Sequence, residues 1–196
     1  MRIEIVVFDG FDEMDALGPY EVFANAAEAS SEWEVRLVGA AGGGVVTGAH
    51  GLRVLTDFGL AEHGQPGAIV VPGGGWADRA PAGAWHEVQE GNLTRDLAEL
   101  APGCRWVASV CTGAMLLASA GLTKGRPATT HHIAIEDLRA TGADVREGVR
   151  YVDDGDLLTS AGVTAGLDLA CWIVERELGV DVASAVTREM AYVRSS

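Results

Sequence analysis

The sequence predicts an α/β protein in which helices cover both faces of a largely parallel sheet. Short apolar runs rich in Val, Ile and Leu alternate with longer helical patterns along the whole chain. Such alternation is typical of parallel strands joined by helical connections. The 196 residues contain no internal repeat, linker or low-complexity segment. We therefore expect a single domain over residues 1–196, a length that buries a sizeable core without disulfides or metal.

The predicted strands are apolar runs of strand length bounded by turn residues. They cover residues 2–8, 34–38, 68–71 and 105–110. Two hairpins are also expected. In one, glycines punctuate residues 42–51 and the strand continues through 52–55; in the other, Asp153-Asp154-Gly155 turns between residues 151–152 and 157–159.

The predicted helices follow these strands and cover residues 18–29, 84–100, 112–120, 133–140, 165–178 and 182–193. Gly18-Pro19 opens the first helix, because proline is suited to a first turn. The second is interrupted near Gly91-Asn92, where Asn92 is suited to cap a new segment.

Charge and composition exclude several classes of function. The chain has 14 Lys and Arg against 28 Asp and Glu, a net charge of −14. The negative electrostatic field of such a chain disfavours binding to nucleic acids and to anionic membrane surfaces, because proteins bind both through Lys and Arg. The 26 glycines are the compositional anomaly, and with 48% hydrophobic residues they indicate tight turns in a well-packed domain rather than disorder.

Neither a secretory leader nor a transmembrane segment is visible, since the first apolar run is only strand-length. The three cysteines, Cys104, Cys111 and Cys171, make an odd count without a C-x-x-C pair. A disulfide framework is therefore not expected, and a reducing cytoplasm is the expected location. His131-His132 with Glu136 fits no standard zinc spacing, so we expect no metal, and no cofactor.

Cys111 is the leading candidate for chemistry. An apolar strand, residues 105–110, runs into an apolar helix with almost no loop, and Cys111 lies at the junction before Thr112 and Gly113. This is the layout of a nucleophile elbow. A thiol at a helix N-terminus meets unpaired N–H groups and the positive end of the dipole, which should lower its pKa. The alternative is a buried cysteine that serves only packing.

A second candidate is the glycine loop that follows the strand at residues 68–71. Parallel strands end at the same sheet edge, so Gly73, Gly74 and Gly75 should lie beside Cys111. Their backbone N–H groups are suited to binding an oxyanion. Trp76 follows directly and is a candidate pocket residue. The alternative is an ordinary turn.

A nucleophilic cysteine usually needs an acid–base partner, and two residues are candidates. His131 follows Thr129-Thr130, and Asp15 follows the first strand. Spacing alone favours the interpretation of Asp15 as a helix cap or a solvated carboxylate.

Five segments, taken together, resemble the PfpI-like superfamily, a flavodoxin-like branch related to class I glutamine amidotransferases. Within it the chain is most similar to the isocyanide hydratase group. The segments are spread in order over nearly the whole chain: residues 15–22 (DALGPYEV), 71–74 (VPGG), 109–114 (SVCTGA), 128–131 (ATTH) and 158–168 (LTSAGVTAGLD). The resemblance implies a flavodoxin-like three-layer sandwich with a mostly parallel central sheet and a nucleophile elbow.

The resemblance also implies roles for individual residues. Cys111 would be the nucleophile, Asp15 would contact its sulfur as general acid–base, and Thr112 would supply a hydroxyl and an N–H beside it. Gly73 and Gly74 would line the anion pocket. Three further residues would lie near the pocket wall: His131, Thr164 and Asp168. His131 has the alternative of a hydrogen-bonded structural histidine, and Asp168 that of an anchor for the helix it begins.

The implied activity is that of a lyase, the cysteine-dependent hydration of an isocyanide to an N-formamide through a thioimidate. Thr112 stands where the protease-like members carry His, which argues against a peptidase. His132 and the loop 75–78 also differ from the hydratase pattern, so the physiological substrate stays open. The alternatives are a glyoxalase or deglycase-like enzyme acting on methylglyoxal, and a non-catalytic ligand or redox sensor. The family also implies a homodimer with a small-molecule substrate.

Overall fold

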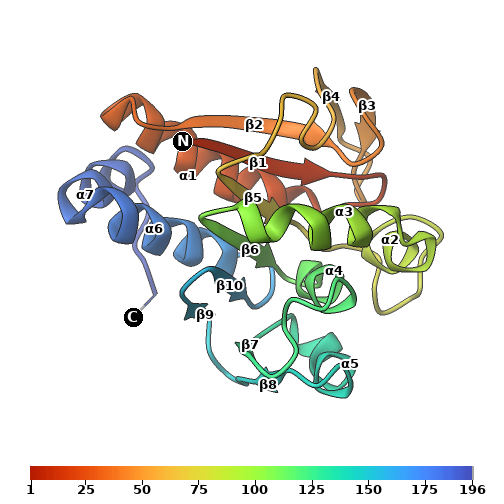
Figure 1. The fold of residues 1–196 in the computed structure, drawn as a ribbon. Helices are drawn as coiled ribbons and strands as arrows, with labels where there is room; N and C mark the ends of the chain where they lie inside the picture. Colours follow the sequence, from red (N-terminus) through yellow and green to blue (C-terminus); the bar gives the residue numbers. More distant parts are fainter. Residues whose placement is uncertain (196) are drawn as a thin grey trace.

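The computed structural model describes residues 1–195, and a six-stranded sheet forms its centre (Figure 1). The strand order is β2-β1-β5-β6-β10-β9. Pairing is parallel except between β10 and β9. The predicted mostly parallel sheet is therefore confirmed. The strands are β1 (Arg2–Val7), β2 (Glu34–Gly39), β5 (Ala68–Val71), β6 (Trp106–Val110), β9 (Tyr151–Asp154) and β10 (Leu157–Ser160).

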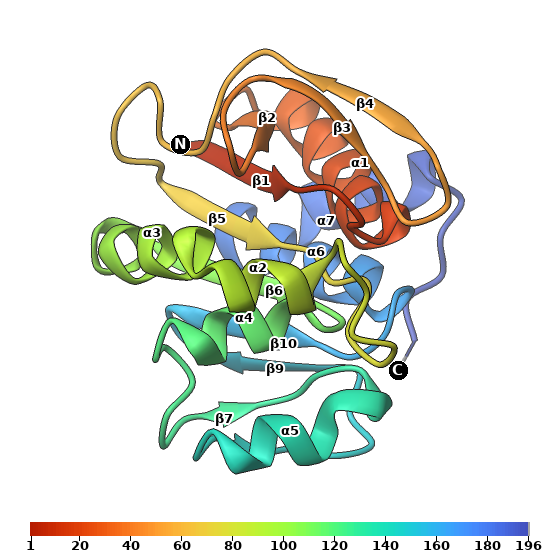
Figure 2. The same ribbon diagram turned by 90° about the vertical axis from the view of Figure 1, so that its right-hand side faces the viewer.

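Helices cover both faces of this sheet and make the predicted three layers (Figures 1 and 2). On one face, α1 packs against α6 and α7; on the other, α2, α3 and α4 pack together. Both faces are thus shielded from water, and the central strands β5 and β6 are buried along their whole length. The helices are α1 (Glu13–Ser30), α2 (Ala84–Glu90), α3 (Asn92–Leu100), α4 (Gly113–Ser119), α5 (Ile135–Ala140), α6 (Ala165–Leu178) and α7 (Val180–Glu189).

The first helix begins earlier than predicted. We expected Gly18-Pro19 to open it, but α1 starts at Glu13, and the side chain of Asp12 caps it by accepting the N–H of Met14 at 3.1 Å. Pro19 lies inside the helix. It has no N–H to donate to the carbonyl four residues earlier, which is the carbonyl of Asp15. The earlier start places Asp15 in the first turn rather than in a loop.

Other elements differ from prediction in detail. The cap of α3 is Gly91, with φ of +75°, and not Asn92, because the chain turns there through a left-handed residue. The predicted helix 133–140 divides into a 3-10 turn, η2 (His132–Ala134), and α5. The last helix, predicted over 182–193, covers Val180–Glu189. Sequence patterns missed three short elements: η1 (Ala101–Gly103) and the parallel pair β7 (Pro127–Ala128) and β8 (Asp144–Val145).

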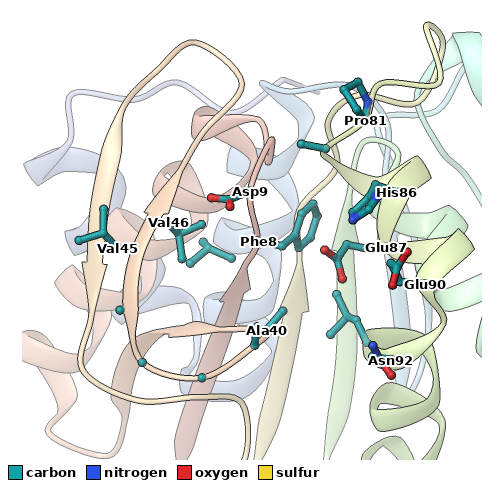
Figure 3. A pocket seen from close by; sticks show the side chains of 17 residues that line it. Phe8, Asp9, Ala40, Val45, Val46, Pro81, His86, Glu87, Glu90 and Asn92 are labelled. Carbon is teal, nitrogen blue, oxygen red and sulfur yellow. The ribbon is translucent and has the colours of Figure 1, made fainter.

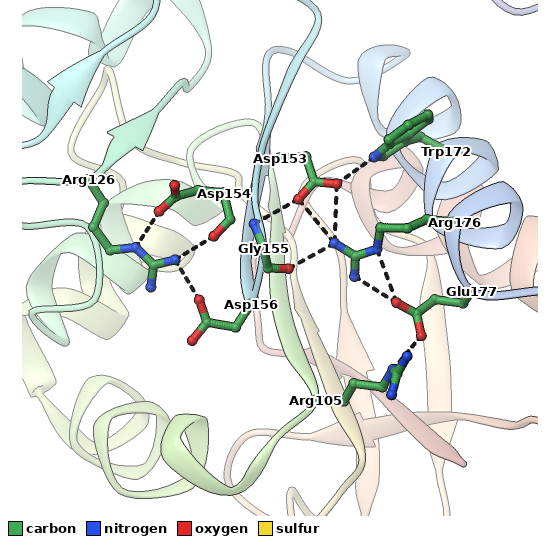
Figure 4. A network of polar contacts seen from close by, with 9 residues as sticks. All are labelled: Arg105, Arg126, Asp153, Asp154, Gly155, Asp156, Trp172, Arg176 and Glu177. Atoms are coloured by element: carbon green, nitrogen blue, oxygen red, sulfur yellow. Dashed lines mark hydrogen bonds and ion pairs between the residues drawn. The ribbon is translucent and has the colours of Figure 1, made fainter.

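Both predicted hairpins are present. The first is the separate antiparallel pair β3 (Gly44–Thr47) and β4 (Arg53–Thr56). The second, β9–β10, forms one edge of the central sheet, and a polar network joins its turn to α6 (Figure 4). Asp153 accepts the indole N–H of Trp172 at 2.7 Å and pairs with Arg176 at 3.0 Å. Arg126 pairs with Asp154 from the other side of the turn.

The topology fixes where a site should lie. The chain proceeds from β1 to β2 in one direction and from β5 through β6 to β10 in the other, so the strand order reverses between β1 and β5. Ligands of open α/β sheets bind at such a reversal, beyond the carboxyl ends of the strands. Among residues 1–195, no helix combines the length and the apolar character needed to cross a membrane.

Candidate active site

Cys111 lies in a sharp turn between β6 and α4 and is only 7% exposed. Its φ of +57° is rare for a residue with a side chain. The main chain is held on both sides: the N–H of Cys111 donates to the carbonyls of Ser160 (3.2 Å) and Ala161 (3.1 Å), and its carbonyl accepts the Thr130 hydroxyl at 2.9 Å. These contacts support the strained geometry of the predicted nucleophile elbow.

Two glycines allow the elbow to approach its neighbours. A Cβ on Gly113 would lie 2.1 Å from the carbonyl oxygen of Val71, and a Cβ on Gly73 would lie 2.4 Å from the Thr112 hydroxyl oxygen. Neither distance is compatible with a side chain. Part of the glycine excess is therefore explained by the close contact between the β5 loop and the start of α4.

Asp15 is fully buried and meets both the glycine loop and Cys111. Its Oδ2 accepts the N–H of Gly73 at 3.1 Å. Its Oδ1 has no hydrogen-bond partner of good geometry among the described residues, and the carboxyl group faces the Cys111 thiol. The reading of Asp15 as a helix cap or solvated carboxylate is therefore wrong, since Asp12 is the cap.

Burial, and then the charge of Asp12, raises the pKa of Asp15 to about 7. Burial, and then the charge of Asp15, raises the pKa of Cys111 to about 12. The expected fall of the thiol pKa is therefore wrong: the backbone N–H groups of Thr112 and Val163 do lower it, but burial outweighs them. Between these two pKa values, the Asp15–Cys111 pair carries a single negative charge.

Gly73 and Gly74 do not offer the free donors that the sequence suggested. The N–H of Gly73 is taken by Asp15, and the N–H of Gly74 donates to the Thr112 hydroxyl oxygen at 3.0 Å. The N–H groups that face the sulfur belong to Thr112 and Val163. Sequence reasoning missed Val163, because no residue pattern signals its left-handed backbone, which has φ of +40°.

Gly75 and Trp76 follow Gly74 and contact other segments. Gly75 has φ of +62°, and a Cβ there would lie 2.5 Å from the carbonyl oxygen of Ala82. Trp76 is buried, donates its indole N–H to Asp137 at 2.7 Å and packs edge-on against Trp85. Trp76 therefore joins the loop to α5. The sequence had led us to expect it in the wall of the pocket beside Cys111.

His131 lies close to the elbow, next to Thr130 in the chain. Its ring fills the space left by Gly162 and lies tilted at 37° against His132 with ring centres 4.1 Å apart, and its Nδ1 accepts the N–H of Ile133 at 3.4 Å. Burial lowers its pKa. His131 and Val163 both line a cavity of about 620 Å³ beside the elbow.

Thr164 and Asp168 lie at the start of α6, and both accept hydrogen bonds from Arg150. Thr164 is exposed, and its hydroxyl accepts from Arg150 at 3.3 Å. Asp168 is buried; it pairs with Arg150 and accepts the Tyr192 hydroxyl and the Ser195 N–H, each at 2.9 Å. These contacts make Asp168 an anchor for the end of the chain. Among residues 1–195, no three His, Cys, Asp or Glu residues gather as metal ligands would.

A larger cavity of about 670 Å³ lies elsewhere, between the β3 region and α2 (Figure 3). Phe8, Asp9, His86, Glu87 and Glu90 are among the side chains that line it. Burial raises the pKa of Glu87. Neither Cys111 nor Asp15 is among its lining residues, so cavity size alone does not locate the candidate site.

The DJ-1/PfpI family model matches residues 1–176. The chain belongs to the DJ-1/PfpI family. This DJ-1/PfpI protein is 32% identical over 194 residues to the isonitrile hydratase of Pseudomonas putida, across 98% of its own length and 78% of the relative's. It is also 30% identical over 181 residues to a deglycase of Pyrococcus abyssi, across 89% and 96% of the two chains. Isonitrile and isocyanide are two names for the same functional group.

Solved structures of the family agree with the fold of this DJ-1/PfpI protein. A ThiJ/PfpI family protein from Pseudomonas syringae superimposes with a TM-score of 0.86 at 25% identity, over 100% of this chain and 76% of that one. Drosophila melanogaster DJ-1beta superimposes with a TM-score of 0.82 at 20% identity, over 98% of both chains. The second likeness concerns the fold alone.

Proposed function

We propose that this protein is a cysteine-dependent lyase that hydrates an isonitrile to an N-formamide. Cys111 is the nucleophile and Asp15 the general acid–base. The observation that carries the proposal is the buried Asp15 carboxyl group facing the thiol, with a pKa raised to about 7. A carboxyl group that exchanges its proton near neutral pH beside a nucleophile is suited to acid–base catalysis. The 32% identity to an isonitrile hydratase supports the choice of substrate.

The first step joins the sulfur to the terminal carbon of the isonitrile. In the singly ionised pair the pKa values place the charge on Asp15, so the reactive form arises when the thiol passes its proton to that carboxylate. The N–H groups of Thr112 and Val163 favour the resulting negative charge on the sulfur. The sulfur donates an electron pair to the isonitrile carbon as that carbon takes the proton from Asp15. The product is a thioimidate, S–CH=N–R, and the Asp15 carboxylate is left as a base.

The second step consumes one water. The Asp15 carboxylate accepts a proton from water as the hydroxyl adds to the thioimidate carbon, and Asp15 then passes that proton to the nitrogen. The tetrahedral intermediate expels the sulfur as a thiolate while its hydroxyl proton moves to Asp15, which gives H–CO–NH–R and restores the pair with its single charge. The net change is R–NC plus water to the N-formamide, with no redox step.

The test is conversion of an alkyl isonitrile, with the N-formamide followed by proton NMR. Wild type should give many turnovers per protein, and Cys111→Ala should give none. Cys104→Ala is the matched control, because Cys104 is a free cysteine outside the pair and should leave turnover unchanged. A single labelling event without turnover would contradict the hydratase and favour a sensor that uses the same thiol.

A deglycase-like activity on methylglyoxal is the second candidate, and the 30% identity to an archaeal deglycase favours it. It needs the same thiol to attack an aldehyde carbon. Loss of methylglyoxal measured in parallel with isonitrile conversion separates the two activities. If wild type consumes methylglyoxal faster by kcat/KM, the hydratase assignment is overturned.

A further inference from the structure

A cavity of about 520 Å³ opens between the first turn of α1 and the β3–β4 loop. Half of its lining residues are apolar, and two of these, Met14 and Leu52, are 39% and 45% exposed. Side chains of this kind gain from covering by an apolar ligand. The lining residues are Asp12, Glu13, Met14, His50, Leu52 and Val163.

This cavity adjoins the reacting pair. Val163 lines it and also directs its backbone N–H at the Cys111 sulfur. Asp12 lines it and lies close enough for its charge to act on both Asp15 and Cys111. The cavity and the Cys111 sulfur therefore have Val163 as a common neighbour.

Glu13 fixes the wall formed by the β3–β4 loop. One carboxylate oxygen accepts the backbone N–H groups of His50 (2.7 Å) and Leu52 (3.3 Å), and the other bonds the His50 ring at 2.7 Å. Gly48 packs against the same carboxylate so closely that a Cβ would lie 2.5 Å from it. Leu52 is thus held opposite the helix turn that carries Met14, and the cavity does not depend on a freely moving loop.

We propose that this cavity binds the apolar substituent of the isonitrile, and that Met14 and Leu52 determine which substituents are accepted. The inference rests on the proposed function and extends it to a substrate class. The isocyano group is the only polar part of an alkyl or aryl isonitrile, and it is consumed at Cys111, so the remainder needs an apolar site. The carboxylates of Asp12 and Glu13 at the same cavity disfavour substituents with a negative charge. The expected substrates are neutral isonitriles with a bulky alkyl or aryl group.

The test compares kcat/KM for methyl, cyclohexyl and 3-carboxypropyl isonitrile. Wild type should prefer cyclohexyl over the other two. In Leu52→Ala, kcat/KM for cyclohexyl isonitrile should fall roughly 10-fold, the usual effect of lost apolar contact on discrimination, while methyl isonitrile is little affected. Leu55→Ala is the matched control, since Leu55 lies on the same hairpin, is 71% exposed and does not line the cavity. An unchanged cyclohexyl-to-methyl ratio in both Leu52→Ala and Met14→Ala overturns the inference and leaves the hydratase intact.

A second readout does not depend on turnover. N-methyl- and N-cyclohexylmaleimide alkylate a thiol by the same addition, and mass spectrometry of the Cys111 peptide measures each rate. In wild type, N-cyclohexylmaleimide should alkylate Cys111 faster than N-methylmaleimide does, and Leu52→Ala should remove that preference. If this holds in a protein that hydrates no isonitrile, the proposed function fails while the apolar subsite stands. Equal ratios in wild type and Leu52→Ala contradict the subsite whatever the activity.

Discussion

Asp15 costs the protein stability at neutral pH because its charged form is poorly solvated in the fold. Its pKa is raised from 3.8 to about 7, so the folded state holds the proton more tightly than the unfolded chain does. The unfolded chain therefore loses its proton first as pH rises, and ionisation favours unfolding. The free energy of unfolding should decline between roughly pH 4 and pH 7 from this residue alone.

Replacing Asp15 by Asn should therefore stabilise the protein and inactivate it. An amide keeps an acceptor for the Gly73 N–H and removes the charge. We expect the free energy of unfolding to rise by about 1–3 kcal/mol at pH 8, with a much smaller gain near pH 4. Urea titrations at both pH values measure the difference. Asp181→Asn, on the exposed start of α7, is the control. An equal effect at the two pH values would show that charge is not the cause.

The same variant should lower the pKa of the Cys111 thiol, because the neighbouring Asp15 charge raises it in wild type. The rate of Cys111 alkylation by iodoacetamide, measured against pH, reports this directly.

In wild type, kcat/KM for an isonitrile should rise with pH to a plateau above about pH 7, where the pair of Asp15 and Cys111 has lost its first proton. A pH–rate profile that is flat from pH 5 to pH 9 would count against this pair as the reacting groups.

Individual residues differ in how far the sequence could place them. An apolar strand followed at once by a helix predicts the junction position of Cys111. The pKa direction of its thiol was not predictable, because burial depends on residues from distant segments such as Ala161 and Val163. The donors of Gly73 and Gly74 were misjudged for a similar reason: their partners, Asp15 and Thr112, come from other parts of the chain.

At the scale of whole elements, apolar periodicity predicted nearly all strands and helices and most of their starts, but not the start of α1. The largest difference is α1, where Pro19 suggested a first turn and Asp12 proved to be the cap. A proline inside a helix is tolerated where packing supports the surrounding turns, and Gly18 and Pro19 are both buried. The pair β7–β8 escaped notice because two-residue strands carry no periodicity to detect.

The junction between β6 and α4 should be sensitive to any added side chain. Gly113→Ala places a Cβ against the Val71 carbonyl oxygen, a rigid backbone atom, and should destabilise the protein by about 2–3 kcal/mol. Gly18→Ala is the matched control: it lies within a helix, and its Cβ would meet the mobile end of Leu167 at 3.3 Å. Its effect should stay within about 1 kcal/mol. Thermal denaturation of the two variants checks the contrast, and equal losses would contradict it.

At the scale of the whole molecule, the net charge of −14 bears on self-association. The homodimer implied by the family resemblance stays a prediction. Two copies with this charge repel each other through water, and salt screens that repulsion over about 10 Å at 0.1 M ionic strength. Dimerisation should therefore strengthen as NaCl is raised from low concentration to about 0.3 M. Light scattering that reports a 20.4 kDa particle at every salt concentration would exclude the dimer.

The hydrogen bond from Gly73 to Asp15 has a spectroscopic consequence. A backbone amide that donates to a carboxyl oxygen changes its nitrogen and proton resonances when that carboxyl group gains or loses its proton. The Gly73 amide resonance therefore reports the ionisation of Asp15, because its nitrogen lies 3.1 Å from the Asp15 Oδ2 atom. In a nitrogen-15-enriched sample, a single cross-peak of the nitrogen–proton correlation spectrum therefore follows the ionisation of Asp15, without substrate or inhibitor.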